Sequence, residues 1–240
     1  MRAIAVIAAR ELRAYLAGMI GYVVAAIFLL LSGYFFIALL LNPFGPPETR
    51  YWFGNVTVTL LIVVPAITMR LLAEERRSGT IELLMTSPVT EWQVVLGKYA
   101  GSMAFYGLIL ALLLQYPILL ARVSNPDLGP IVSGFVGLVL FGGLFISVGL
   151  LFSSLTKNQI IAFVTTFGVL LSLYIIDWMA GSVGSPWGDL LTYLSVRRHL
   201  ENFAKGVVDT RDVVFYVSTI ALMLYFATRS LASAKAWGGE

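Results

Sequence analysis

The residues best placed to do chemistry in this sequence are clustered charges rather than catalytic side chains. Five charged residues fall within nine positions, from Glu74 to Glu82. The chain has one histidine, His199, and no cysteine, which excludes disulfides, thiol catalysis and cysteine-ligated metal sites. It contains no Walker A motif, no HExxH and no GxSxG. The pattern therefore favours an interaction surface over an active site.

The charges belong to the segment 73–97, AEERRSGTIELLMTSPVTEWQVVLG. It is too long for a tight connection between antiparallel helices, which usually takes about 2–8 residues. Its middle predicts a short helix with an apolar face and a charge opposite, formed by Ile81, Leu84, Met85 and Glu82. Pro88 ends that helix, and Thr90 with Gln93 predicts a capping box that starts the next one. The pattern leaves two roles open for this short helix: it could dock onto a partner protein, or it could rest on the lipid headgroups.

The elements that hold this segment must lie in a membrane. Hydrophobic residues make up 59% of the 240 positions, charged residues 12%, and the mean hydropathy is +0.88. A soluble domain carries about 25% charge, and a chain of this size cannot bury so much apolar surface in one water-soluble core. The composition excludes an ordinary soluble enzyme domain, and we expect the lipid bilayer, not nucleic acid, as the surroundings.

Six runs are long and apolar enough to cross a bilayer as helices. They cover residues 18–41, 52–72, 99–121, 131–153, 159–177 and 213–231. Because lipid offers backbone groups no hydrogen bonds, such runs predict an all-α integral membrane protein. Pro117 predicts a kink in the third span. Small residues spaced four apart in the fourth span, such as Gly149 and Ser153, favour close packing within the chain over a dimer contact.

The distribution of lysine and arginine predicts the orientation. With the N-terminus in the cytoplasm, ten basic residues lie inside and six outside. Six spans then return the C-terminus to the cytoplasm, so both termini are expected there.

Two further polar segments flank the spans. Residues 1–17 have an amphipathic pattern that predicts an interfacial helix, with a simple positively charged anchor as the equal alternative. Residues 178–212 predict an outer cap, helical from Leu190 to Ala204, in which His199 is expected to be structural or solvated. Asp209 is a predicted N-cap for the last helix, and Thr156 with Gln159 predicts a second capping box before the fifth span.

The charged segment resembles the hallmark region of ABC-2-type transporter permeases. That region reads Glu-Glu-Arg-x-x-Gly-Thr-x-Glu-x-Leu-x-x-x-Pro after the second span and reaches a Gly-Lys before the third. The matching residues here are Glu74, Glu75, Arg76, Gly79, Thr80, Glu82, Leu84, Pro88, Gly97 and Lys98. Residues 153–163 and 199–216 resemble the gliding-motility-type branch, many members of which occur in bacteria that do not glide.

This resemblance implies a permease subunit in a bacterial cytoplasmic (inner) membrane. It implies two separate ABC-type ATPase subunits, which bind the Mg-ATP, and a second copy of this or a similar permease, so no cofactor is expected in this chain. It leaves open an extracytoplasmic accessory subunit. It also makes segment 73–97 a coupling helix region that inserts into the ATPase, with Thr80 to Met85 as the inserted helix.

Residue roles follow from the resemblance as hypotheses. Charges at the foot of the second span would pair with the ATPase or the N-terminal helix; they are Glu74, Glu75, Arg76 and Arg77. Gly79 would permit a sharp turn, and Ile81, Leu84 and Met85 would make the apolar contacts. Polar residues of the second and fifth spans are candidates for the translocation path, although such side chains more often bond their own helix. They are Asn55, Thr59, Thr165 and Ser172.

Three functions are therefore weighed. The leading one is the permease subunit of an ABC transporter, most simply an exporter. The second is a force-transmitting or scaffolding subunit of an ATPase-driven envelope complex that transports nothing itself. The third is a membrane enzyme, whose polar groups would have to come from Arg197, Arg198, His199 and Glu201.

Overall fold

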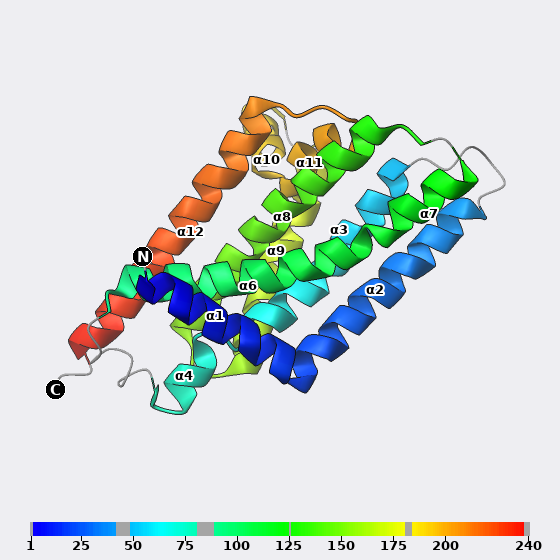
Figure 1. Cartoon of the computed structure of the whole chain (residues 1–240). Coiled ribbons are helices and arrows are strands. Elements are labelled where there is room, and N and C mark those ends of the chain that lie inside the picture. Colours follow the sequence, from blue (N-terminus) through cyan, green and yellow to red (C-terminus); the bar gives the residue numbers. More distant parts are fainter. Residues whose placement is uncertain (1, 42–48, 81–88, 125, 181–183, 238–240) are drawn as a thin grey trace.

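The computed structural model describes residues 2–41, 49–80, 89–124, 126–180 and 184–237, and within these ranges every regular element is an α-helix. Figure 1 shows the long helices running side by side as one bundle. In chain order the helices are α1 (Arg2–Ala17), α2 (Met19–Leu40), α3 (Thr49–Thr68), α4 (Ala73–Arg77), α6 (Glu91–Leu113), α7 (Gln115–Val123), α8 (Leu128–Leu155), α9 (Gln159–Ala180), α10 (Trp187–Leu194), α11 (Val196–Ala204) and α12 (Thr210–Trp237). Residues Ile81, Glu82, Leu84, Met85 and Pro88 lie outside the described ranges.

Six helical stretches in the described part are long and apolar enough to cross a membrane. They are Met19–Leu40, Thr49–Arg77, Glu91–Arg122, Leu128–Leu155, Gln159–Met179 and Thr210–Ser233. Each overlaps one of the six predicted runs, so the prediction of an all-α, six-span membrane protein is confirmed at this level. The start of α1, the helix α4 and the end of α12 lie at one end of the bundle, and α10 and α11 lie at the other (Figure 1).

The fourth span, α8, is the most enclosed by its neighbours after α3. Its small residues let other helices approach: a Cβ at Gly137 would lie 2.7 Å from the Cβ of Phe203 on α11. A Cβ at Gly149 would overlap the Thr68 hydroxyl on α3. The predicted use of these small residues for packing within the chain is therefore confirmed.

The third span is divided between α6 and α7. α6 ends at Leu113 and α7 begins at Gln115. Pro117 lies two residues after Gln115, and its ring nitrogen carries no N–H to donate to the preceding turn. The predicted disruption near Pro117 is thus present as a break at Leu114. It gives α7 a direction of its own beside α2 (Figure 1).

The end of the bundle that carries α10 and α11 departs from one sequence prediction. The single helix expected over Leu190–Ala204 is wrong, because the backbone of Ser195 is extended, with ψ 110°. The Ser195 hydroxyl accepts a hydrogen bond from the Arg198 N–H at 3.4 Å and so caps a new helix. Asp209 does cap α12 as predicted, accepting from the Arg211 N–H at 2.9 Å.

The N-terminal helix α1 packs along α6. Gly97 and Gly101, one turn apart on α6, face it: a Cβ at Gly101 would lie 2.7 Å from the Cβ of Glu11 and 2.8 Å from the Ala8 carbonyl oxygen. α6 itself starts at the predicted capping box. The Thr90 N–H donates to the Gln93 side chain at 3.2 Å, and the Gln93 N–H donates to the Thr90 hydroxyl at 3.4 Å. The start of the third span is therefore fixed locally by sequence.

Candidate functional site

The described part of the charged segment is the short helix α4 and the turn after it. Its first turn carries Glu74 and Glu75, and its last carries Arg76 and Arg77. This order suits the helix dipole, which favours acidic groups at the N-terminus and basic groups at the C-terminus. Gly79 then adopts a φ of +73°, a conformation that L side chains rarely take. The predicted sharp turn at Gly79 is present.

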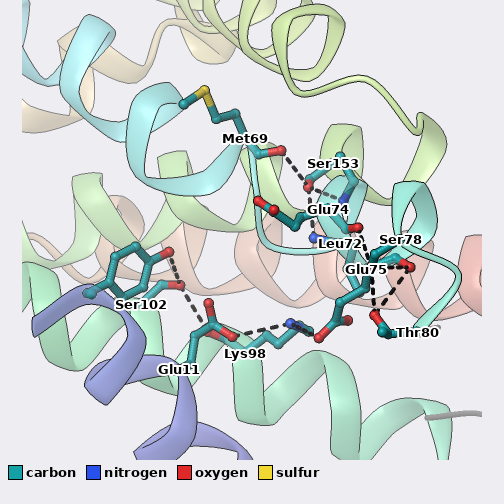
Figure 2. Close-up of polar contacts among 12 residues, drawn as sticks. Glu11, Met69, Leu72, Glu74, Glu75, Ser78, Thr80, Lys98, Ser102 and Ser153 are labelled. Carbon is teal, nitrogen blue, oxygen red and sulfur yellow. Dashed lines mark hydrogen bonds and ion pairs between the residues drawn. The ribbon is translucent and has the colours of Figure 1, made fainter. Parts of the chain in front are cut away.

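A buried lysine joins α4 to the rest of the bundle. The Nζ atom of Lys98 lies 2.9 Å from Glu75 Oε1 and 3.2 Å from Glu11 Oε2, and its side chain is only 4% exposed. Figure 2 shows the lysine lying between the two carboxylates, one from α4 and one from α1. Glu75 and Glu11 are themselves largely covered, with 17% and 13% of their side chains exposed. One cation therefore bridges three helices, α1, α4 and α6.

The bridge is the part of the site that sequence reasoning did not assemble. Lys98 belongs to the motif that resembles the permease hallmark, and Glu11 lies in the amphipathic stretch 1–17, but neither pattern predicts that the two side chains pair. The sequence signal was that Lys98 is the only basic residue between Arg77 and Arg122 and stands beside a long apolar run. A charge at that position needs a partner when it is buried.

The other acidic residue of α4 contacts the fifth span. The Gln159 amide at the start of α9 donates to Glu74 Oε2 at 2.6 Å. The predicted capping box of Thr156 with Gln159 is therefore wrong. Asn158, directly before α9, accepts from the Ile160 N–H at 2.9 Å, and this nearer cap leaves the Gln159 side chain free to reach α4.

A serine of α8 holds the chain between α3 and α4. Ser153 Oγ accepts from the Leu72 N–H at 3.0 Å and from the Ala73 N–H at 3.1 Å, and donates to the Met69 carbonyl at 3.1 Å (Figure 2). Ser153 is fully buried. These three bonds satisfy backbone groups at the point where the second span ends. The end of α3 is thus attached to α8 by one side chain.

We expect Ser153→Ala to lower the free energy of unfolding by about 1–3 kcal/mol, because two buried N–H groups would lose their acceptor. Thermal and denaturant unfolding in detergent would measure the change. Ser172→Ala is the matched control, since the Ser172 hydroxyl is exposed and bonds only its own helix, at the Gly168 carbonyl. Equal stabilities of the two variants would show that Ser153 does not anchor this junction.

The arginines at this end of the bundle make further cross-helix contacts. The Arg76 guanidinium donates to the Ser230 carbonyl on α12 at 3.4 Å. The Arg70 guanidinium lies over the ring of Tyr15, 4.5 Å from its centroid. Tyr15 in turn donates to the Ile67 carbonyl at 2.8 Å, and its burial raises the pKa of the phenol well above the usual range. The hydroxyl therefore stays a donor that ties α1 to α3.

The four candidate path residues each make a hydrogen bond within their own helix. The Asn55 amide donates to the Tyr51 carbonyl, and the Thr59 hydroxyl donates to the Asn55 carbonyl. Thr165 and Ser172 likewise bond their own helix, at Ile161 and Gly168, and they lie on an exposed face of α9. Asn55 lines a cavity of about 400 Å³ beside α11. A shared path through these four residues stays a prediction.

The lone histidine occupies a structural position. His199 Nδ1 lies 2.6 Å from Asp212 Oδ1, and Nε2 lies 2.9 Å from the Tyr193 carbonyl oxygen. The ring stacks on Phe215, with centroids 3.9 Å apart, and the residue is 9% exposed. Both ring nitrogens thus contact groups of the same chain, which agrees with the prediction that His199 is structural or solvated and favours the structural role. No cluster of three potential metal ligands occurs among the residues in the described ranges.

Taken together, the fold and the site define a class of protein: a helical membrane protein with six candidate spans, whose charged segment after the second span is tied to the bundle by buried polar contacts. The chain belongs to the ABC-2 family of transporter proteins, whose family model matches residues 49–193, more than half of the sequence.

Two relatives from Escherichia coli strain K12 are similar to it. The chain is 25% identical over 199 residues to the probable multidrug ABC transporter permease YbhR, an alignment that covers 80% of this chain and 54% of the relative. It is 29% identical over 131 residues to the probable multidrug ABC transporter permease YbhS, covering 49% of this chain and 34% of that relative. The chain thus spans about half the length of YbhR. These matches give no support to the gliding-motility-type branch.

Proposed function

We propose that this chain is the membrane-spanning permease subunit of an ABC transporter, driven by separate ATPase subunits that contact the segment 73–97. Membership of the ABC-2 family supports this function. The absence of a Walker A motif from the sequence is in line with a partner that supplies the nucleotide site. The Mg-ATP would then be bound and hydrolysed entirely by that partner.

The observation that carries the proposal is the attachment of α4 to the bundle. Glu75 is bridged by Lys98 to α6 and α1, and Glu74 is held by α9. The backbone at the start of α4 is held by Ser153 of α8. Because protein interiors are close-packed and transmit displacement, a push on α4 would reach four helices at once. This is what a segment that receives movement from an ATPase requires.

Export is the proposed direction, and two permease copies are the proposed assembly. YbhR and YbhS are named as probable multidrug transporter permeases, which favours small amphipathic substrates here as well. The excess of basic residues at the α4 end, ten against six, supports cytoplasmic termini in a bacterial inner membrane. In this assembly α1 would lie at the cytoplasmic interface and α10 with α11 would cap the outer face.

Intact-complex mass spectrometry after extraction in a mild detergent tests this assembly. We expect two ATPase subunits and two permease subunits in one particle, with any accessory subunit visible as added mass. A particle that never contains an ATPase would contradict the proposal.

The second candidate is a subunit that transmits force to envelope proteins without transporting a substrate. It needs the same attachment of α4, so geometry does not separate the two. ATP-dependent movement of ethidium in proteoliposomes containing the whole complex would favour the transporter. ATP hydrolysis that is responsive to the permease, without movement of any tested amphiphile, would favour the force-transmitting subunit.

We expect Gly79→Pro to cause a several-fold loss of permease-stimulated ATPase activity while leaving the bundle folded. Proline fixes φ near −65°, whereas Gly79 has a φ of +73°, so the chain beyond it must leave in a different direction. Among the described residues, no atom apart from those of its two chain neighbours lies within 4 Å of a Cβ built at Gly79, so a clash with them would not explain the loss.

Gly79→Asn is the matched control, because asparagine tolerates this left-handed conformation better than other residues with a side chain. It should retain most of the stimulated activity. Unchanged stimulation in Gly79→Pro, with the complex still assembled, would defeat the coupling role of this segment.

A further inference from the structure

A long apolar groove lies between α2 and α7, at the end of the bundle away from α4. Tyr116 bridges the two helices: its hydroxyl donates to the Leu29 carbonyl at 2.7 Å, and its ring lies 5.2 Å from that of Phe36. Gly33 makes room for this contact, since a Cβ there would lie 2.7 Å from the Tyr116 hydroxyl. Beside this bridge the helices leave a groove of about 1030 Å³.

The groove has the length of one membrane leaflet. Its wall on α2 runs from Ala26 to Leu40, which at 1.5 Å per residue is about 21 Å. Half of a hydrocarbon core about 30 Å thick is about 15 Å, so the groove passes from near mid-membrane into the headgroup region. The exposed apolar side chains Leu30 and Ile37 lie along it. These dimensions suit one extended acyl chain.

The headgroup end of the groove carries a cation. Arg122, in the last turn of α7, lines the groove and is exposed. Within the part of the chain that the structure describes, its guanidinium has no ion pair and no side-chain hydrogen bond. Neither α2 nor α7 contains an aspartate or glutamate. The groove therefore combines an apolar trough with an exposed guanidinium at its mouth.

We propose that this groove binds one anionic phospholipid, with an acyl chain along α2 and the phosphate on Arg122. A guanidinium presents donors in a planar fork that matches phosphate oxygens and forms charge-assisted hydrogen bonds with them. A second copy of the chain is a poorer occupant. A symmetric contact made by α2 and α7 alone would bury Arg122 without any carboxylate, which is costly.

Native mass spectrometry of the full chain in a maltoside detergent tests the site. The probes are dioleoyl phosphatidylglycerol and dioleoyl phosphatidylcholine, which share their acyl chains and differ in headgroup charge. We expect the wild-type chain to retain one phosphatidylglycerol several-fold better than phosphatidylcholine. Arg122→Gln should reduce phosphatidylglycerol retention to the phosphatidylcholine level. Ala26→Phe, which fills the exposed trough, should reduce retention of both lipids.

Lys205→Gln is the matched control, because it removes another exposed basic residue near the same end of the bundle without touching the groove. It should retain phosphatidylglycerol as the wild type does. An unchanged headgroup preference in Arg122→Gln, or unchanged retention of both lipids in Ala26→Phe, would overturn the proposal. Because the chain has no native cysteine, Leu30→Cys adds a direct test of the second copy. Efficient disulfide-linked dimers through that position would assign the groove to a protein interface and also overturn it.

Discussion

A chain carrying Lys98→Met is expected to lose about 3 kcal/mol of folding free energy and most of its permease-stimulated ATPase activity. Methionine fills a similar volume but leaves Glu11 and Glu75 facing each other without the cation that lies 3.2 Å and 2.9 Å from them. Both carboxylates are mostly covered, so water would not fully replace the lysine. Removing one partner of a buried ion pair lowers stability more than replacing both partners, because it leaves a buried charge without compensation.

The measurements are denaturant unfolding of the chain in detergent and ATP hydrolysis by the assembled complex. The triple variant Glu11→Gln, Lys98→Met, Glu75→Gln should recover much of the stability, because no unpaired charge remains. It should not recover coupling, because the link from α4 to α1 and α6 is still lost. Lys205→Met, at an exposed lysine, should change neither quantity. A stable, fully active Lys98→Met variant would show that the Lys98 bridge is needed neither for folding stability nor for the stimulation of ATPase activity.

Gly101→Leu is expected to push α1 away from α6 and to lower the free energy of unfolding by about 1–3 kcal/mol. Even a Cβ at this position would lie 2.7 Å from the Cβ of Glu11 and 2.8 Å from the Ala8 carbonyl oxygen. Backbone atoms of α1 cannot rotate away as a side chain can, so the whole helix must shift. The shift would also pull Glu11 from Lys98, which links this variant to the previous one.

Gly107→Leu gives a matched control on the same helix, since within the described ranges no atom beyond its chain neighbours and its own helix backbone lies within 4 Å of a Cβ built there. It carries the same change in helix propensity and hydrophobicity without the clash. Limited proteolysis near the N-terminus and unfolding in detergent would distinguish the two variants. Equal behaviour of Gly101→Leu and Gly107→Leu would mean that close packing of α1 on α6 is not needed.

Much of the fold could be predicted because its signals are local. A run of about 20 apolar residues identifies a span whatever its neighbours are, and all six predicted runs correspond to candidate spans. The capping box at Thr90 and Gln93 was equally readable, since both partners lie within one turn. The family resemblance also rested on a contiguous motif, and the family model confirms its broad level.

The wrong predictions concern helix ends where more than one nearby residue could act as the cap. Ser195 interrupted a pattern that was apolar at helical spacing on both sides, because its hydroxyl caps α11. Asn158 displaced Thr156 as the cap of α9 because it stands nearer the first turn. In both cases the residue types were visible, and the choice between caps depended on how the neighbouring segments were packed.

The sequence by itself determined that this protein lies in a lipid bilayer, how many spans it has and in which segment its charges are concentrated. These properties follow from composition and from patterns within about 20 residues. Only the tertiary structure decided which charges meet. Lys98 and Glu11 are 87 positions apart, and they pair because Gly97 and Gly101 let α1 lie directly on α6. Two charges far apart in the sequence can pair only where their helices approach closely. Close approach depends on how the surfaces of both helices fit together, so it cannot be read from either segment alone.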